Sequence, residues 1–180
     1  MDIYENPEHS VTQVVIPAHV FIVENTGWSK ERVEGDMKNI ITIFSKHGVM
    51  FSLKIKYTFL LDDTEHEDFR DFIYSDYYQS SQGRDYFFDK DKIIFIYIFN
   101  ESIRQSNYLA GHVPNTTTVV FTNRADNSTA AHETGHIMGL LDIIKEGNNL
   151  MEAWRSTNID EIYLTPEQMR IANEYLQSRG

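Results

Sequence analysis

Cysteine is absent from the 180 residues of the chain. Its absence excludes disulfide bonds, thiolate metal ligands and a thiol nucleophile, and it leaves the redox compartment undecided. No apolar run approaches the roughly 20 residues that a membrane-spanning helix needs, so no membrane span is expected. The opening residues, Met1 to Glu5, lack the basic and apolar regions of a signal peptide. Localisation therefore stays open between removal of a leader, export without one, and residence inside the cell.

Basic residues are also scarce, with 16 Lys and Arg against 27 Asp and Glu and a formal net charge of −11. This balance argues against nucleic acid or an anionic membrane as a partner. An acidic excess usually serves to solvate the surface. A mild preference for cationic substrates is the alternative.

The pattern of apolar residues predicts one domain of alternating strands and helices. A length of 180 residues with 41% hydrophobic content suits a single buried core. Ser29 and Gly48 mark the start and end of a first helix, and Thr165 to Gln168 form a capping box for the last one. Strands are predicted at residues 11–23, 49–61, 93–99, 108–113 and 117–122, and a further helix at 64–77. The strand at 93–99 is a continuous apolar run, so we expect it at the centre of the sheet.

The segment His132-Glu133-Thr134-Gly135-His136 carries the clearest chemistry. Residues four apart lie on one face of a helix, so the imidazoles of His132 and His136 can bind one metal ion together. Glu133 is turned about 100° around the helix axis, which suits a general base acting on a metal-bound water. Asp126, Asn127 or Ser128 is expected to cap this helix.

The residues that follow supply a third ligand. Gly139 can adopt the left-handed conformation that ends a helix, and the chain then returns Asp142 towards the ion. Three protein ligands leave one position of a tetrahedral zinc ion for water, which is the arrangement of catalytic sites. Such an ion lowers the pKa of its water to about 7 and polarises the carbonyl that the water attacks. The sequence therefore predicts a zinc hydrolase with one catalytic Zn²⁺.

Three local patterns resemble the metzincin metallopeptidases, over nearly the whole chain. The first is the motif itself, in which Asp142 stands where most of the clan has His and where snapalysin-like bacterial members have Asp. The second is Asn149-Leu150-Met151, which is similar to the Met-turn beneath the zinc. The third is Leu109-Ala110-Gly111-His112-Val113-Pro114, which is similar to the edge strand that holds substrate in matrixin-like members.

The resemblance implies an α/β (α+β) catalytic domain spanning residues 1–180. Its parts would be a twisted mixed five-stranded sheet, an active-site helix, a Met-turn and a C-terminal helix, divided into an upper subdomain of about 1–139 and a lower one of about 140–180. It implies His132, His136 and Asp142 as zinc ligands, Glu133 as base and Met151 as an apolar floor. Leu109, Ala110, Gly111 and His112 would contact a peptide or protein substrate. It also favours a secreted or exported protein.

Two departures from the family pattern affect the expected chemistry. Asp142 is anionic where His would be neutral, so the water on the ion should be less acidic. Ala153 stands two residues after Met151, where some metzincins carry a Tyr that stabilises the transition state. Another group would have to replace that Tyr, or the enzyme works without it.

Three functions are compatible with these residues. The first is an endopeptidase of broad specificity. The second is a proteolytic effector or toxin aimed at a single target protein, which would leave casein intact. The third is a non-catalytic zinc-binding protein, against which Glu133 argues, because a structural zinc site has no use for that carboxylate. The sequence does not indicate an oligomeric state.

Overall fold

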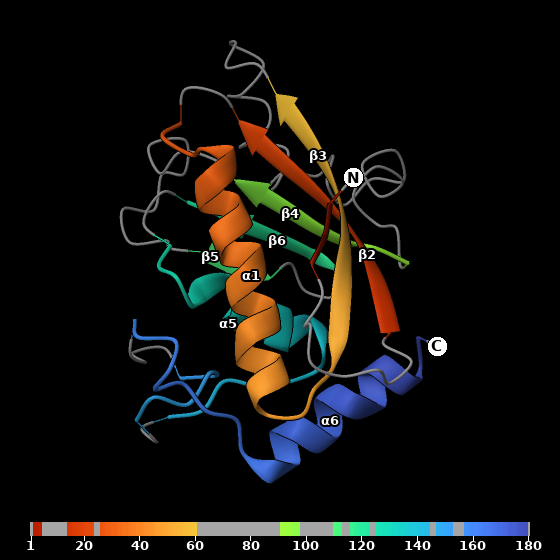
Figure 1. Ribbon diagram of the computed structural model, residues 1–180. Helices are drawn as coiled ribbons and strands as arrows, with labels where there is room; N and C mark the ends of the chain where they lie inside the picture. The colour runs from red at the N-terminus through yellow and green to blue at the C-terminus, as the bar shows by residue number, and fades with distance from the viewer. Residues whose placement is uncertain are drawn as a thin grey trace.

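A mixed sheet of six strands forms the centre of the protein (Figure 1). The computed structural model describes residues 2–4, 14–23, 26–60, 91–97, 110–112, 116–122, 125–144, 147–152 and 157–179. The strands are β1 (Asp2–Tyr4), β2 (Val14–Val23), β3 (Phe51–Leu60), β4 (Ile93–Tyr97), β5 (Ala110–His112) and β6 (Thr118–Phe121). Their order across the sheet is β1-β3-β2-β4-β6-β5.

Four neighbouring strands, β3, β2, β4 and β6, run parallel, and the two edge strands run antiparallel to them. The sheet has one strand more than the five that were expected. Strand β1 is only three residues long, which is too short for apolar and polar residues to show a period. All five residues of β4 are buried, and β4 lies between β2 and β6, which confirms the predicted central strand.

Pro17 lies inside β2, although proline cannot donate a hydrogen bond to a neighbouring strand. Strand β2 pairs with β3 from Val14 onwards, but its pairing with β4 begins only at Ala18. At Pro17, β2 is therefore flanked by a strand on one side only, and the proline is tolerated there.

Three described helices pack with this sheet. Helix α1 (Lys30–Lys46) begins at Ser29, whose side chain accepts a hydrogen bond from the backbone N–H of Arg32, and the chain leaves it through Gly48 at φ +74°. Helix α6 (Pro166–Gln177) begins with the predicted capping box of Thr165 and Gln168. Helix α5 (Thr129–Ile137) carries the histidine motif. The predicted helix at 64–77 lies outside the described residues.

One face of the sheet and the three helices share a continuous apolar core. In Figure 1, α1 lies across the sheet and α6 runs beneath it. Alternate residues of the central strands face this core, among them Val20, Phe95 and Phe121, and α1 contributes Met37 and Phe44. The core places α5 against α1 and against the edge strand β5.

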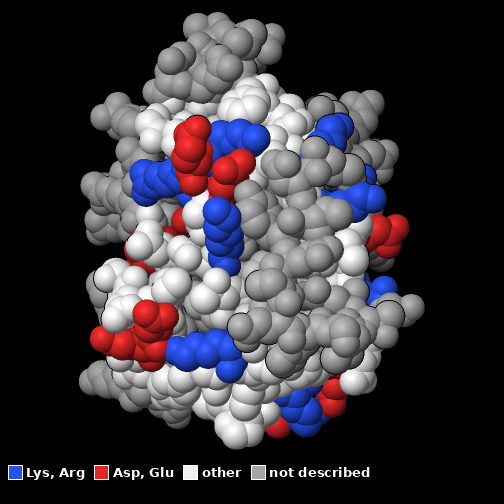
Figure 2. All heavy atoms as spheres, in the orientation of Figure 1, with Lys and Arg blue, Asp and Glu red and all other residues white. Residues whose placement is uncertain are grey.

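The exposed face of α1 carries charges of both signs. Figure 2 shows acidic and basic side chains side by side on this face, and Lys30 and Glu34 form an ion pair at 3.3 Å. No helix among the described residues is long and apolar enough to span a bilayer.

Candidate metal centre

Helix α5 is fixed at its start by Asp126. The Asp126 carboxylate Oδ1 accepts hydrogen bonds from the backbone N–H and hydroxyl of Ser128 and from the hydroxyl of Thr129, at 2.8 to 2.9 Å. Ser128 occupies the cap position itself but makes no capping bond with its side chain. Of the three predicted caps, Asp126 therefore provides the side-chain acceptor that holds the first turn.

Helix α5 ends as its glycine predicts. Gly139 has φ +89°, and the N–H of Leu140 bonds to the carbonyl of Gly135 at 2.9 Å. This pattern of a left-handed glycine with a backbone bond across the last turn is the usual way to close a helix. The chain reverses at this point and brings Asp142 back beside the histidines.

The three residues predicted as ligands meet at one point. The Nε2 atoms of His132 and His136 lie 3.2 Å apart. The Oδ1 atom of Asp142 lies 3.4 Å from the first of them and 3.3 Å from the second. The two imidazole rings are nearly perpendicular, at 88°. The histidine side chains are largely buried, whereas the Asp142 side chain is 67% exposed, so the cluster is accessible from the aspartate side.

The hydrogen bond at Nδ1 determines which nitrogen of each imidazole ring carries the proton. The Nδ1 of His132 lies 2.8 Å from the carbonyl oxygen of Leu150, and the Nδ1 of His136 lies 2.9 Å from that of Leu140. A carbonyl can only accept, so both Nδ1 atoms must donate, and in the neutral rings both Nε2 atoms present lone pairs. Two lone pairs and a carboxylate oxygen then face one another, an arrangement that a cation or a shared proton stabilises.

The spacing of the three atoms fits zinc. Bonds of 2.0–2.1 Å at tetrahedral angles place the ligand atoms of zinc about 3.3 Å apart. Imidazole nitrogen with one carboxylate is a usual zinc donor set, whereas magnesium and calcium prefer oxygen alone. Among the described residues, His132, His136 and Asp142 form the only group of His, Cys, Asp or Glu side chains with such spacing.

Glu133 is adjacent to His132 in α5 and is 7% exposed. Its position in the helix turns it about 100° away from its neighbour. Its side chain is therefore largely buried and leaves the helix in a different direction from the His132 imidazole.

Met151 packs against α5 at Gly135, which stands between the two histidines in the sequence. Its side chain is fully buried, and a Cβ atom added to Gly135 would lie 2.5 Å from its sulfur. Real atoms do not approach so closely, so Gly135 leaves the space that the methionine fills. Gly135 itself is a signal for this contact, since a glycine inside a helix weakens the helix and usually has a packing or functional reason.

The predicted substrate-contact segment is described only in part. Ala110, Gly111 and His112 form β5, the edge strand antiparallel to β6, and β5 packs against α5. Leu109 lies outside the described residues. The β5 edge of the sheet is therefore adjacent to the helix that carries the metal cluster.

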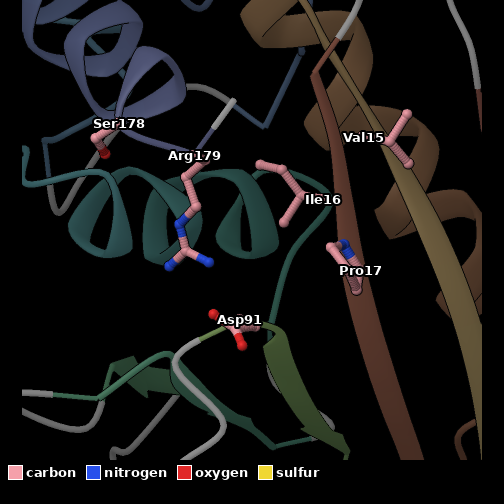
Figure 3. Close-up of a pocket in the computed structure, with 6 residues that line it drawn as sticks. All are labelled: Val15, Ile16, Pro17, Asp91, Ser178 and Arg179. Atoms are coloured by element: carbon pink, nitrogen blue, oxygen red, sulfur yellow. The ribbon is translucent and has the colours of Figure 1, made fainter.

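A separate hollow of about 560 Å³ lies away from these residues, at the amino ends of β2 and β4 (Figure 3). Its lining residues are Val15, Ile16, Pro17, Asp91, Ser178 and Arg179. Asp91 and Arg179 extend into it from opposite sides. None of the predicted site residues lines it.

No protein-family model matches the sequence, and no curated protein matches it. Its fold is similar to that of metalloproteinase-II from Bacteroides fragilis, with a TM-score of 0.59 at 16% sequence identity. The match covers 96% of this chain and 56% of the other, so the chain spans little more than half the length of that protein. A zinc-dependent peptidase from Methanocorpusculum labreanum (strain Z) also matches, at 14% identity and a TM-score of 0.45, over 87% of this chain and 100% of that one.

The likeness to metalloproteinase-II is one of fold. It confirms, in general form, the mixed α/β architecture that the sequence predicted. Several contacts at the site were not predicted, namely those of the Leu140 and Leu150 carbonyls with the histidines and of Gly135 with Met151. Backbone carbonyls leave no trace in a sequence, so the first two could not have been found there.

Proposed function

We propose that the protein is a zinc-dependent endopeptidase. The observation that carries the proposal is the convergence of His132 Nε2, His136 Nε2 and Asp142 Oδ1 within 3.2–3.4 Å, while both Nδ1 atoms donate to backbone carbonyls. The fold likeness to a metalloproteinase supports it. A peptide bond is the substrate that this combination favours.

His132, His136 and Asp142 would hold the ion, which when bound supplies Lewis acidity towards the scissile carbonyl and the attacking water. Glu133 would take the proton of that water as it attacks and return it to the leaving amine. The hydrogen bonds from Nδ1 fix the tautomer of each histidine, so that Nε2 is free to bind metal. The exposed side of Asp142 would leave room for the substrate.

The substrate would lie extended along β5, adding a strand at this edge of the sheet. Residues 109–112 would then contact it, mainly through their backbone groups. Exposed apolar side chains also flank the third ligand, since Leu141 is 80% and Ile144 is 88% exposed. These two side chains would suit bulky apolar residues of a substrate.

The finer family assignment belongs to the same proposal. Asn149-Leu150-Met151 would serve as a Met-turn beneath the zinc, and the whole chain would form one metzincin-like catalytic domain. The upper subdomain would hold the sheet and the metal-binding helix, and the lower one, from about residue 140, would hold this turn and α6.

The test is cleavage of a diverse peptide library by the zinc-loaded protein. The Glu133→Gln variant should bind zinc and fold normally but cut nothing, because it lacks the base. Glu174→Gln, an exposed change on α6, is the matched control and should cut like the native chain. Cleavage that persists in Glu133→Gln would refute the assignment of the base. A folded, zinc-bound native protein that cuts no peptide would refute a broad endopeptidase and leave a single-target effector.

A further inference from the structure

The turn at residues 149–151 contributes one contact to the metal cluster. The carbonyl oxygen of Leu150 accepts the Nδ1 proton of His132 at 2.8 Å. Leu150 is fully buried, so water does not compete for this bond. The orientation of the Leu150 carbonyl therefore decides the orientation of the His132 ring and the nitrogen that it offers to a metal.

The same peptide unit is held at its other end by Asn149. The N–H of Met151 donates to Asn149 Oδ1 at 2.9 Å. The carbonyl of Leu150 and the N–H of Met151 belong to one planar trans peptide, so they point in opposite directions. When Asn149 holds the N–H, it also aims the carbonyl at His132.

Asn149 is in turn held by Gln168, in the first turn of α6. Each amide donates to the other, at 2.9 Å from Asn149 Nδ2 and at 3.0 Å from Gln168 Nε2. Gln168 Oε1 also accepts from the backbone N–H of Thr165 at 2.8 Å. The Thr165 N–H must face the oxygen of the Gln168 amide, and the Met151 N–H must face the oxygen of the Asn149 amide. Each side-chain amide therefore has only one possible orientation.

Both amides are buried, with Asn149 fully enclosed and Gln168 8% exposed. A buried amide that loses its partner is left with an unpaired polar group that water cannot reach, so the pair strongly prefers this arrangement. Gln168 therefore does more than complete a capping box. It connects the start of α6, through Asn149 and one peptide unit, to the first histidine of the cluster.

We propose that Gln168 is a positioning residue for zinc binding, which acts through Asn149 and the Leu150 carbonyl on His132. The inference rests on the zinc site of the proposed function. It does not require that the protein cleave peptides.

The main variant is Gln168→Glu. A glutamate can still accept from Thr165 and from Asn149, but it cannot donate to Asn149 Oδ1 and places an oxygen against it. We expect the affinity for zinc to fall about tenfold, as is typical when a group that orients a metal ligand is changed. Competition with a chromophoric chelator measures this affinity.

Thr165→Ala is the matched control. It removes the 3.2 Å hydrogen bond that the Gln168 N–H donates to Thr165 Oγ1, and it leaves the amide pair in place. It should lower the urea concentration at the midpoint of unfolding through the lost cap and leave the affinity for zinc unchanged. A tenfold loss of zinc affinity in this control as well would mean that α6 acts only through general stability, and the proposal would be wrong.

A second measurement does not depend on zinc. In the metal-free protein, the His132 Nδ1 proton should give a slowly exchanging NMR signal that persists in Thr165→Ala and disappears in Gln168→Glu. Gln168→Met, which buries no charge, should show the same loss of zinc affinity and the same loss of the NMR signal. It replaces Gln168→Glu if that variant does not fold. Retention of the signal and of native zinc affinity in a folded Gln168 variant overturns the proposal. Failure of the native chain to bind zinc would refute the proposed function, whereas the NMR signal would still test the positioning.

Discussion

Replacement of Asp36 by Asn is expected to change how the stability of the protein depends on pH. Asp36 lies on α1 and is only 6% exposed. The pKa of its carboxyl is raised from 3.8 to about 7, mainly by burial and also by nearby Asp126, while Arg32 and the hydroxyl of Tyr97 oppose the rise. The same face of α1 supports the start of α5, since Arg32 donates to the carbonyl of Ala125 at 3.2 Å.

The sign and size of the effect follow from the two pKa values. Below pH 3.8 the carboxyl is protonated in both states and contributes no pH dependence. Between pH 3.8 and about 7 the unfolded chain has lost this proton while the folded chain keeps it, so stability falls as the pH rises. At about 1.4 kcal/mol for each pH unit, the total loss is about 4 kcal/mol, of which about 3 kcal/mol falls between pH 5 and pH 8.

Urea unfolding at pH 5, 6, 7 and 8 measures this directly. Asn cannot ionise, so the free energy of unfolding of Asp36→Asn, relative to the native chain, should rise by about 3 kcal/mol from pH 5 to pH 8. Glu34→Gln is the control on the same helix and should keep the native pH dependence, because Asp36 is still present. A difference between Asp36→Asn and the native chain that stays constant from pH 5 to pH 8 would refute the buried, protonated state of Asp36.

Three further predictions concern the metal cluster. Gly135→Ala should destabilise the protein by about 1–3 kcal/mol in urea unfolding, because the new Cβ meets the Met151 sulfur at 2.5 Å, and an unchanged stability would show that the methionine can move away. Asp142→Ala should lose zinc and activity together. The metal-free variant should keep its stability, since this side chain is 67% exposed. Full activity with retained metal would remove Asp142 from the ligand set. Zinc at 100 times its dissociation constant should add about 2.7 kcal/mol to the free energy of unfolding, and a chelator should reverse the gain. An equal gain in His132→Ala would place the zinc elsewhere.

Local patterns predicted the parts of the fold that depend on neighbouring residues. The helix ends at Ser29, Gly139 and Thr165 are encoded within a few residues, and the structure places each of them as expected. The spacing of His132 and His136 likewise follows from one turn of helix. Strand β1 was missed because three residues carry too little pattern, and only its pairing with β3 identifies it.

The metal cluster contains features that a local sequence pattern predicts and one feature that it does not. The segment from His132 to Asp142 contains all three expected ligands, and a helix followed by a glycine turn is enough to bring them together. It does not determine the rotation of the His132 ring, because the Nδ1 partner, the Leu150 carbonyl, lies 18 residues away. That carbonyl is held by Asn149, and Asn149 by Gln168 a further 19 residues along the chain. A peptide that contained only residues 125–144 would keep the ligands but leave this imidazole free to rotate and to exchange tautomers. The motif therefore specifies which atoms can bind a metal, and the packing of α6 against the turn specifies how the first of them is presented.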